Sequence, residues 1–418
     1  MRISDCGFWG FWIEARISFR LNPQPQIRNS QSPIRNPKSA IDMRRIYLDY
    51  NASTPLASEV VEAIRPFLGE HYGNPSSMHW AGQPAREAVE AARAEVAALL
   101  GADPTEIVFT SGGTEANNYA IKGAYFRSRI RQPHIVTTTI EHPAVLEPCR
   151  FLERLGARLT LVPVDSTGLV APEDIRRAVT RETILISVMH ANNEVGTLQP
   201  IAEIGRFARE RGIVFHTDAA QTAGKIPAEV GGLHADMLSI AGHKLYAPKG
   251  VGALYVREGQ ELEPLMHGAG HEAGRRAGTE NVLLIVALGA ACRLARTDPC
   301  SERMRALRDF FWQRLQETFG PGVVLNGHPT SRLPNTLNVS FPGHLGQEVL
   351  DKLEGVAAST GSACHAGSHT MSPVLSAMGL EARVGLGAVR FSLGRVTTAD
   401  EIEEVVQRLG PIVREGSK

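Results

Sequence analysis

The stretch "IAEIGRFARERGIVFHTD", residues 201–218, contains the pattern that decides the fold. It places apolar side chains at helical spacing, closes that segment on Gly212, and continues into a short apolar run that ends in Asp218. Similar alternation runs along residues 59–290, where the other apolar runs are "EIVFT", "HIVTTT", "RLTLVPV", "TILISVM", "DMLSIA" and "GALYV". Continuous apolar strands separated by helices predict a mostly parallel, seven-stranded sheet between helices.

Composition divides the chain into three parts. Residues 1–42 are rich in Arg, Asn, Pro, Gln and Ser, so we expect a disordered or spurious N-terminal extension rather than a secretory signal. An organelle transit peptide is the alternative, although the frequent prolines would break an amphipathic helix. Residues 59–290 form the predicted large domain. Longer helical segments after about residue 290 predict a smaller α+β domain, formed by residues 43–58 and 291–418.

The charge and cysteine content point to a soluble, cytoplasmic protein. Acidic and basic residues balance at 44 each, so bulk charge indicates no nucleic-acid or membrane partner. Five cysteines in 418 residues do not resemble a disulfide framework and favour a reducing compartment. No apolar stretch is long enough to span a bilayer.

Polar residues follow the predicted strands, at the edge where parallel sheets bind ligands. Lys244, in "SIAGHKLYAPKG" (239–250), either opens a solvated loop or forms a Schiff base with an aldehyde cofactor. Asp218 either caps a helix or pairs with a cation such as a protonated pyridine ring. His142, in "TTIEHPAV", could lie on a cofactor ring or move a proton, although a lone histidine there is more often structural.

Two further segments supply a phosphate cradle and a thiol. In "FTSGGTEANN" (109–118), Gly113 and Thr114 open a helix and can present backbone N–H groups to phosphate, although a Gly-rich turn alone is a weak signal. In "ASTGSACHAGSH" (358–369), Cys364 lies among small and polar residues, which argues against a buried thiol. Cys292, in an apolar helical run, fits the buried alternative, and His365 either favours the Cys364 thiolate or is a spectator.

The motifs taken together resemble the cysteine desulfurases of the NifS/IscS type, within the class V aminotransferase group of fold-type I pyridoxal phosphate enzymes. The resemblance covers the chain from about residue 45 to the C-terminus. The motifs that carry it are "YLDYNASTP", "GNPSS", "SGGTEANN", "EHPAV", "HANNEVGTLQP", "HTDAAQ", "GHKLYAPKG", "RAGTEN", "GSAC" and "RFSLGR".

This resemblance implies pyridoxal 5'-phosphate as the cofactor. Lys244 would form the Schiff base, Asp218 would pair with the ring nitrogen and His142 would stack on the ring. Gln221 and Asn192 would lie near the phenolic oxygen.

The resemblance also implies where the phosphate binds. The implied phosphate ligands are Gly113, Thr114, His243 and, from the other subunit of a homodimer, Thr279 of the partner subunit. One position departs from the family pattern, because the family usually has Ser where this chain has Ala241. Ser239 or a water molecule is the candidate to replace the missing hydroxyl.

The implied reaction converts L-cysteine to L-alanine and leaves the sulfur on Cys364 as a persulfide. Asn51, Asn192 and Arg390 would bind the substrate, and Lys244 would move the α-proton with help from His142. The persulfide would pass to an iron–sulfur scaffold or another acceptor. The alternatives are a selenocysteine lyase, a different class V aminotransferase-like enzyme and, from another class, a catalytically silent binding subunit.

Overall fold

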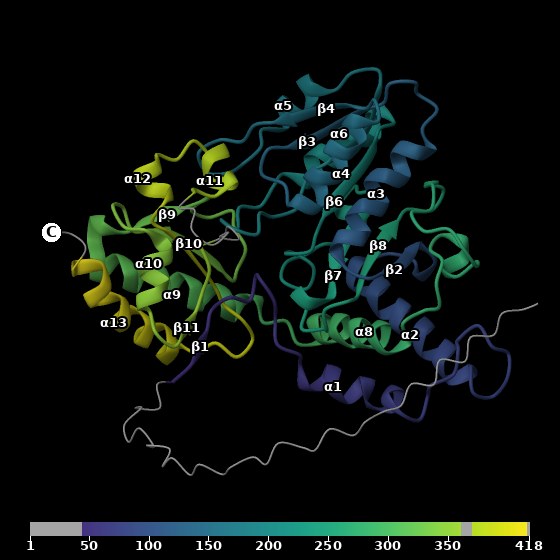
Figure 1. Ribbon diagram of the computed structural model, residues 1–418, viewed down its shortest axis with the longest axis horizontal. Coiled ribbons are helices and arrows are strands. Elements are labelled where there is room, and N and C mark those ends of the chain that lie inside the picture. The colour runs from purple at the N-terminus through teal and green to yellow at the C-terminus, as the bar shows by residue number, and fades with distance from the viewer. Residues whose placement is uncertain (1–43, 361–369, 416–418) are drawn as a thin grey trace, which may run out of the picture. The chain divides into compact units, whose positions relative to one another are not determined.

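The computed structural model describes residues 44–360 and 370–415, and its largest element is a seven-stranded sheet (Figure 1). β8 is antiparallel to both of its neighbours, and the other neighbouring pairs are parallel. The mostly parallel sheet predicted from the apolar runs is therefore confirmed. In spatial order the strands are β2 (Ile107–Thr110), β8 (Gly252–Val256), β7 (Met237–Ala241), β6 (Val214–Asp218), β5 (Thr183–Ser187), β3 (His134–Thr138) and β4 (Arg158–Val162).

Helices cover both faces of this sheet, because successive strand residues point to opposite sides and both sides are apolar. Val108 and Leu254 pack on one face with α3 (Gly113–Arg127) and α4 (Pro143–Arg154). Ile107 and Ala253 pack on the other face with α2 (Gln83–Leu100) and α8 (Val282–Thr297). That face continues under α5 (Pro172–Ala178) and α6 (Ile201–Arg211).

The closing glycines of the helical segments behave as the sequence predicts. α2 ends at Gly101 and α6 at Gly212, with left-handed φ values of 62° and 64°. Glycine adopts this conformation without the steric cost that a Cβ brings. The chain can therefore turn directly from each helix toward the next strand.

The C-terminal part, together with the residues around β1, forms two smaller sheets. β10 (Thr336–Ser340) lies between β9 (Val324–Asn326) and β12 (Ala388–Ser392), and β1 (Ile46–Tyr47) pairs with β11 (Val356–Ala357). Ile46 and Leu48 share a core cluster with residues of these strands and of two long helices. The remaining helices are α1 (Ser58–Ile64), α7 (Val230–Leu233), α9 (Ser301–Phe319), α10 (Gly346–Lys352), α11 (Pro373–Ala377), α12 (Ala382–Gly385) and α13 (Ala399–Glu415).

Residues from 44 onward belong to one compact unit by their contacts, and the division at residues 59–290 stays a prediction. The expected N-terminal extension, residues 1–42, lies outside the described residues. Among the described helices, none is both long and apolar enough to cross a membrane.

Candidate active site

A cavity of about 490 Å³ opens at the carboxyl ends of the parallel strands. Asp218 and Ala241, the last residues of β6 and β7, lie in its wall. Most of the predicted site residues meet here, although they are spread over the whole sequence. The predicted residues in its lining are Asn51, Gly113, Thr114, His142, Asp218, Gln221, His243, Lys244 and Arg390.

Lys244 is held in this cavity by a tight turn directly after β7. Gly242 begins the turn, and a Cβ at that position would lie 2.8 Å from Val251, so a larger residue would not fit. The Lys244 amine donates hydrogen bonds to the backbone carbonyl groups of Asn51 and Ala52. Burial, assisted by the charge of Arg390, lowers the Lys244 pKa to about 8. The neutral, nucleophilic form of this amine is therefore far more populated near neutral pH than that of an ordinary lysine.

Asp218 presents a buried carboxylate in the wall of the cavity. Its side chain is 7% exposed and accepts hydrogen bonds from the Asn117 side chain at 2.6 Å and from the Ala220 backbone N–H at 2.9 Å. No cation among the described residues lies within ion-pair distance of it. A buried carboxylate in this setting favours a positively charged ligand group, as a protonated pyridine nitrogen would be. The local bond to Ala220 shows that Asp218 also stabilises the turn.

His142 is the N-cap residue of α4, and its ring is fixed by the backbone. The Nδ1 atom accepts a hydrogen bond from the Ala144 N–H at 3.0 Å, so the proton of the neutral ring resides on Nε2. Burial in the cavity wall lowers the His142 pKa. The neutral ring lies in the lining with Lys244 and Asp218 and can stack on a flat ligand or exchange a proton.

The start of α3 forms a cradle for an anion. Gly112, with φ of 148°, precedes the helix and no side chain caps it, so the N–H groups of Gly113 and Thr114 are available. His243 lies beside them in the lining, and its buried Nδ1 atom has no hydrogen-bond partner. Burial lowers the His243 pKa to about 4, so the ring is neutral and can donate one hydrogen bond. These groups fit a phosphate.

Arg390 reaches the cavity from β12. Its guanidinium donates to the Asn193 carbonyl at 3.0 Å and to Asp49 at 2.8 Å, while its buried Nε atom has no partner. The arginine is therefore held rigidly at the cavity wall. A planar guanidinium in this position suits the recognition of a carboxylate.

The structure does not bring Asn192 and Ser239 into the cavity lining. The Asn192 amide donates to the Ile140 carbonyl at 3.0 Å and accepts from two backbone N–H groups, so it stabilises its own loop. Asn193, the next residue, lines the cavity instead. The Ser239 hydroxyl lies inside the sheet, 2.9 Å from His216.

Thr279 lies elsewhere in the chain, and the predicted cysteine cannot be placed from the described residues. Thr279 lines a separate cavity with Gly250 and Arg276, and does not join Lys244 within one chain. Cys364 and its neighbour His365 lie outside the described residues. Ser359, which lines the main cavity, precedes this segment and forms backbone hydrogen bonds with Arg390.

Some site residues were not predicted from the sequence. Asp49, in "YLDYN", orients the Arg390 guanidinium. Asn117, in "SGGTEANN", orients the Asp218 carboxylate. For Asn117, the position four residues after Gly113 on a helix was a usable signal, because it places the side chain on the same face. Lys225, which contacts the cavity-lining Gln221, was not predicted either.

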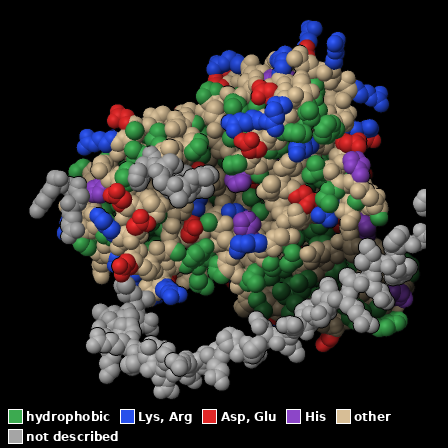
Figure 2. Space-filling view, viewed as in Figure 1, with side chains coloured by type: hydrophobic (Ala, Val, Ile, Leu, Met, Phe, Trp, Pro, Cys, Tyr) green, Lys and Arg blue, Asp and Glu red, His purple; other side chains and the backbone are tan. Residues whose placement is uncertain are grey.

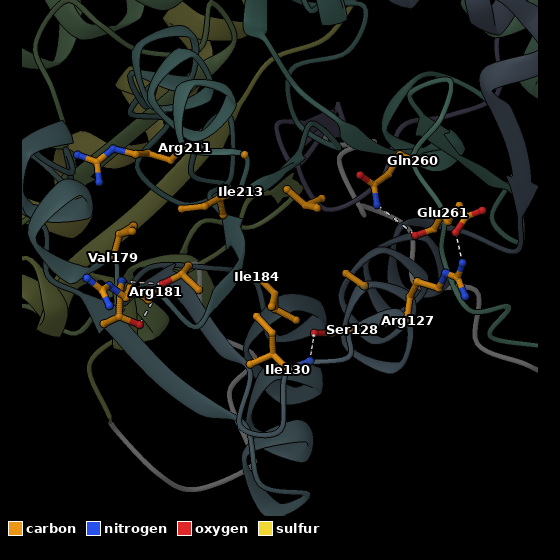
Figure 3. A pocket seen from close by; sticks show the side chains of 15 residues that line it. Arg127, Ser128, Ile130, Val179, Arg181, Ile184, Arg211, Ile213, Gln260 and Glu261 are labelled. Carbon is orange, nitrogen blue, oxygen red and sulfur yellow. Dashed lines mark hydrogen bonds and ion pairs between the residues drawn. The ribbon is translucent and has the colours of Figure 1, made fainter.

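A larger cavity, of about 670 Å³, lies where β5 and β6 begin (Figure 3). Figure 3 shows Ile130, Ile184 and Ile213 directed toward its centre, and Arg127 turned to Glu261, with which it forms an ion pair. Neither Lys244 nor His142, the two predicted catalytic residues that the structure describes, lines it. The cavity at the opposite ends of the strands is therefore the candidate active site.

Comparison with known proteins shows the family to which this chain belongs. The model of the family described as "Aminotransferase class-V" matches residues 46–405. The chain belongs to this family. It is 49% identical to a cysteine desulfurase IscS of Dictyoglomus turgidum, over 88% of this chain and 95% of that protein. It is 44% identical to a cysteine desulfurase of Rattus norvegicus, over 88% of this chain and 82% of that protein.

Similar solved structures have the same fold. A NifS-like protein superposes with a TM-score of 0.83 at 37% identity, covering 89% of this chain and all of that one. The structure titled "SspA in complex with cysteine" superposes with a TM-score of 0.76 at 41% identity, covering 83% and 98% of the two chains. The cofactor of the family is pyridoxal phosphate. The lysine, the buried carboxylate and the unpartnered donors at the start of α3 fit it.

The missing hydroxyl at Ala241 gives a testable prediction. A Cβ on Gly113 would lie 3.2 Å from the Ala241 side chain, so position 241 borders the proposed phosphate cradle. We expect Ala241→Ser to add one donor and to tighten cofactor binding roughly three- to tenfold, the range of one hydrogen bond. The measurement is the dissociation constant of pyridoxal phosphate from the purified apoenzyme. Ala247→Ser, a buried substitution on the same turn, is the control.

Proposed function

We propose that this chain is a pyridoxal phosphate-dependent cysteine desulfurase that converts L-cysteine to L-alanine and collects the sulfur on Cys364. The observation that carries the proposal is the meeting of Lys244, Asp218, His142 and Arg390 around one cavity. The curated relatives named as cysteine desulfurases support it. So does the similar protein whose structure is described as a complex with cysteine.

Each residue has a distinct task in this reaction. The bound cofactor supplies an electron sink for the charge that develops at the substrate α-carbon. The Arg390 guanidinium binds the substrate carboxylate and thereby orients the Cα–H bond toward the Lys244 amine, which accepts the α-proton when neutral. Asp218 stabilises positive charge at the far end of the cavity, and the Nε2–H of His142 can donate a proton. The same groups return a proton when alanine forms.

The sulfur acceptor on the enzyme must be an accessible thiolate. Cys149 and Cys292 are buried, and burial raises the pKa of each thiol to about 12. Cys300 contacts Met304 and Arg395 and does not line the cavity. Cys364 follows the cavity-lining Ser359 by five residues, a chain length that spans at most about 18 Å. These facts support Cys364 as the nucleophile.

In the proposed step, the Cys364 thiolate attacks the sulfur of L-cysteine. An S–S bond forms, the substrate C–S bond breaks, and its electron pair stays with the substrate carbon, which is then protonated to give alanine. The sulfur is oxidised to the persulfide level while the carbon skeleton is reduced, so no external oxidant is needed. The persulfide would pass to an iron–sulfur scaffold or another acceptor protein in the cytoplasm.

We further propose a homodimer in which Thr279 of the partner subunit completes the phosphate site. Met78 and Trp80 are 85% and 80% exposed, and Figure 2 shows apolar side chains gathered around α1 on the same molecule. Exposed large apolar side chains of this kind are typical of subunit interfaces. Analytical ultracentrifugation should give a dimer, and Trp80→Asp should weaken it. A monomeric enzyme of full activity would contradict the dimer while leaving the desulfurase assignment intact.

The experiment that tests the function combines a spectrum with product assays. The purified protein, reconstituted with pyridoxal phosphate, should show a visible absorption band and release equal amounts of alanine and sulfide from L-cysteine in the presence of a thiol reductant. A protein that cannot be reconstituted, or that transfers the amino group to a keto acid without releasing sulfur, would refute the proposal.

The carboxylate contact gives a second prediction. Arg390→Lys keeps the charge but removes the planar fork, so one charge-assisted hydrogen bond is lost. We expect the KM for L-cysteine to rise roughly 10- to 100-fold with a smaller change in kcat. Steady-state alanine formation measures both constants, and Arg383→Lys, outside the cavity, is the matched control. A loss confined to kcat would contradict the carboxylate role.

A further inference from the structure

A buried lysine that the reaction does not use lies directly behind the cofactor cavity. Lys225 ends the turn after β6 and is 6% exposed, and no carboxylate among the described residues pairs with it. The hydroxyl of Ser301, at the start of α9, donates to the Lys225 backbone carbonyl and fixes the segment. A buried ammonium group without a counterion is costly, so its side-chain contact needs an explanation.

That contact is with a residue of the cavity wall. The Lys225 amine donates to the Oε1 atom of Gln221 at 3.0 Å. The Nε2 atom of the same amide donates to the Asn51 carbonyl at 3.0 Å, and the Lys244 amine donates to that carbonyl as well. The Gln221 amide therefore has its oxygen turned to Lys225 and its nitrogen turned to the Asn51 carbonyl, which also accepts from the Lys244 amine.

We propose that Lys225 is a positioning residue that holds the Gln221 amide with its N–H donor facing the cofactor. A glutamine amide can rotate by half a turn at little cost, and the two orientations present either a donor or an acceptor. An ammonium group can only donate hydrogen bonds, so it pairs with the amide oxygen and not with the amide nitrogen. It therefore selects the orientation in which the Gln221 oxygen faces Lys225. The inference rests on the proposed function, because it concerns the same site.

The selected orientation matters because of the chemistry of the cofactor. In pyridoxal phosphate the ring hydroxyl is adjacent to the carbon that carries the aldehyde. A donor beside the Lys244 amine would therefore lie near that ring oxygen in the loaded enzyme and would stabilise its anionic form. If the Gln221 oxygen faced the ring oxygen instead, the partial negative charge of the amide oxygen would be repelled by the anionic ring oxygen.

The orientation of the Gln221 amide depends on whether the Lys225 amine is charged. The titratable groups that act on it are the cations Lys244 and Arg390 and the thiol of Cys300. Burial, together with Lys244, lowers the Lys225 pKa to about 7. The charged form enforces the amide orientation, whereas the neutral amine has a lone pair that can also accept from Gln221.

The test is the pH at which the visible band of the lysine-bound cofactor changes as it loses a proton. After that proton has left, the Gln221 N–H group is the donor on which the anionic ring oxygen depends. The donor therefore stabilises the deprotonated form and lowers the midpoint pH. We expect Lys225→Met and Gln221→Leu each to raise the midpoint by about one pH unit, the effect of one hydrogen bond to a charged group. Lys352→Met, at an exposed position at the end of α10, should leave it unchanged.

The double variant separates positioning from a direct effect of the lysine charge. In the Gln221→Leu background, Lys225→Met should cause no further shift, because the amide that it orients is gone. An undiminished shift in that background, or no shift in Lys225→Met alone, would overturn the inference. Should Lys225→Met fail to fold, Lys225→Gln provides a neutral polar replacement, for which we expect a shift in the same direction. A wild type without a visible band would defeat the proposed function instead.

Discussion

The Lys244→Ala variant is expected to lack the visible band of the bound cofactor and to form alanine from L-cysteine at least about a thousandfold more slowly. The substitution removes both the covalent attachment and the base that accepts the α-proton, and general bases alone contribute factors of roughly 10² to 10⁴. Absorption spectra and alanine assays on matched amounts of protein give the result. Lys249→Ala, an exposed lysine in the same loop, should keep band and activity.

The depressed pKa of Lys244 adds a pH dependence to this prediction. The amine must be neutral to attack the cofactor aldehyde, so reconstitution of the apoenzyme should accelerate as the pH rises through about 8. At pH 7.5 a pKa of about 8 leaves roughly a quarter of the amine neutral, whereas an ordinary lysine would leave roughly one part in a thousand. A reconstitution rate that keeps rising steeply beyond pH 9 would contradict the burial argument.

The strands and the residues that end them were predictable from the sequence because both depend on local pattern. A buried parallel strand is a continuous apolar run, and parallel strands place their carboxyl ends at one edge. Asp218 ends such a run and Lys244 lies just beyond one, and the structure brings both to the same cavity. The start of α3 follows the same logic, since the glycines that permit the turn also leave the helix N–H groups free.

The side-chain directions in loops and within strands were harder to predict. Asn192 and Asn193 are adjacent in an irregular segment without periodicity, so the sequence does not indicate which of them faces the cavity. Ser239 has the same parity as Ala241, but it lies two residues, about 7 Å, further inside the sheet. Its hydroxyl therefore meets His216 rather than a ligand. The contacts of Ser239 are therefore decided by its distance from the end of the strand and not by the face of the sheet on which it lies.

Burial of Lys225 could not be predicted from its neighbours either. The sequence "QTAGK" is typical of a solvated turn, and lysines are rarely buried without a partner. Its burial depends on the start of α9, 76 residues further along the chain, where Ser301 covers the turn. A contact of this kind depends on the tertiary arrangement and leaves no signal in the local pattern.

The Cys364→Ser variant should separate cofactor chemistry from sulfur transfer. Because Lys244 and Asp218 are unchanged, the variant should keep the visible band and still bind L-cysteine, but a serine hydroxyl is not ionised near neutral pH and forms no persulfide. We therefore expect alanine and sulfide formation to fall at least about a thousandfold, as for removal of an essential nucleophile. Spectra with added L-cysteine and both product assays test this.

Two comparisons make that result specific. Cys300→Ser, which removes the one partly exposed thiol among the described cysteines, should retain full activity, because Cys300 lies outside the cavity lining. L-Selenocysteine tests the lyase alternative, because selenium leaves carbon more readily than sulfur does and has less need of an attacking thiolate. If Cys364→Ser lost selenide release but kept sulfide release from L-cysteine, the assignment of Cys364 as the sulfur acceptor would be wrong and the lyase alternative would be favoured, since the thiol would then serve selenium chemistry alone.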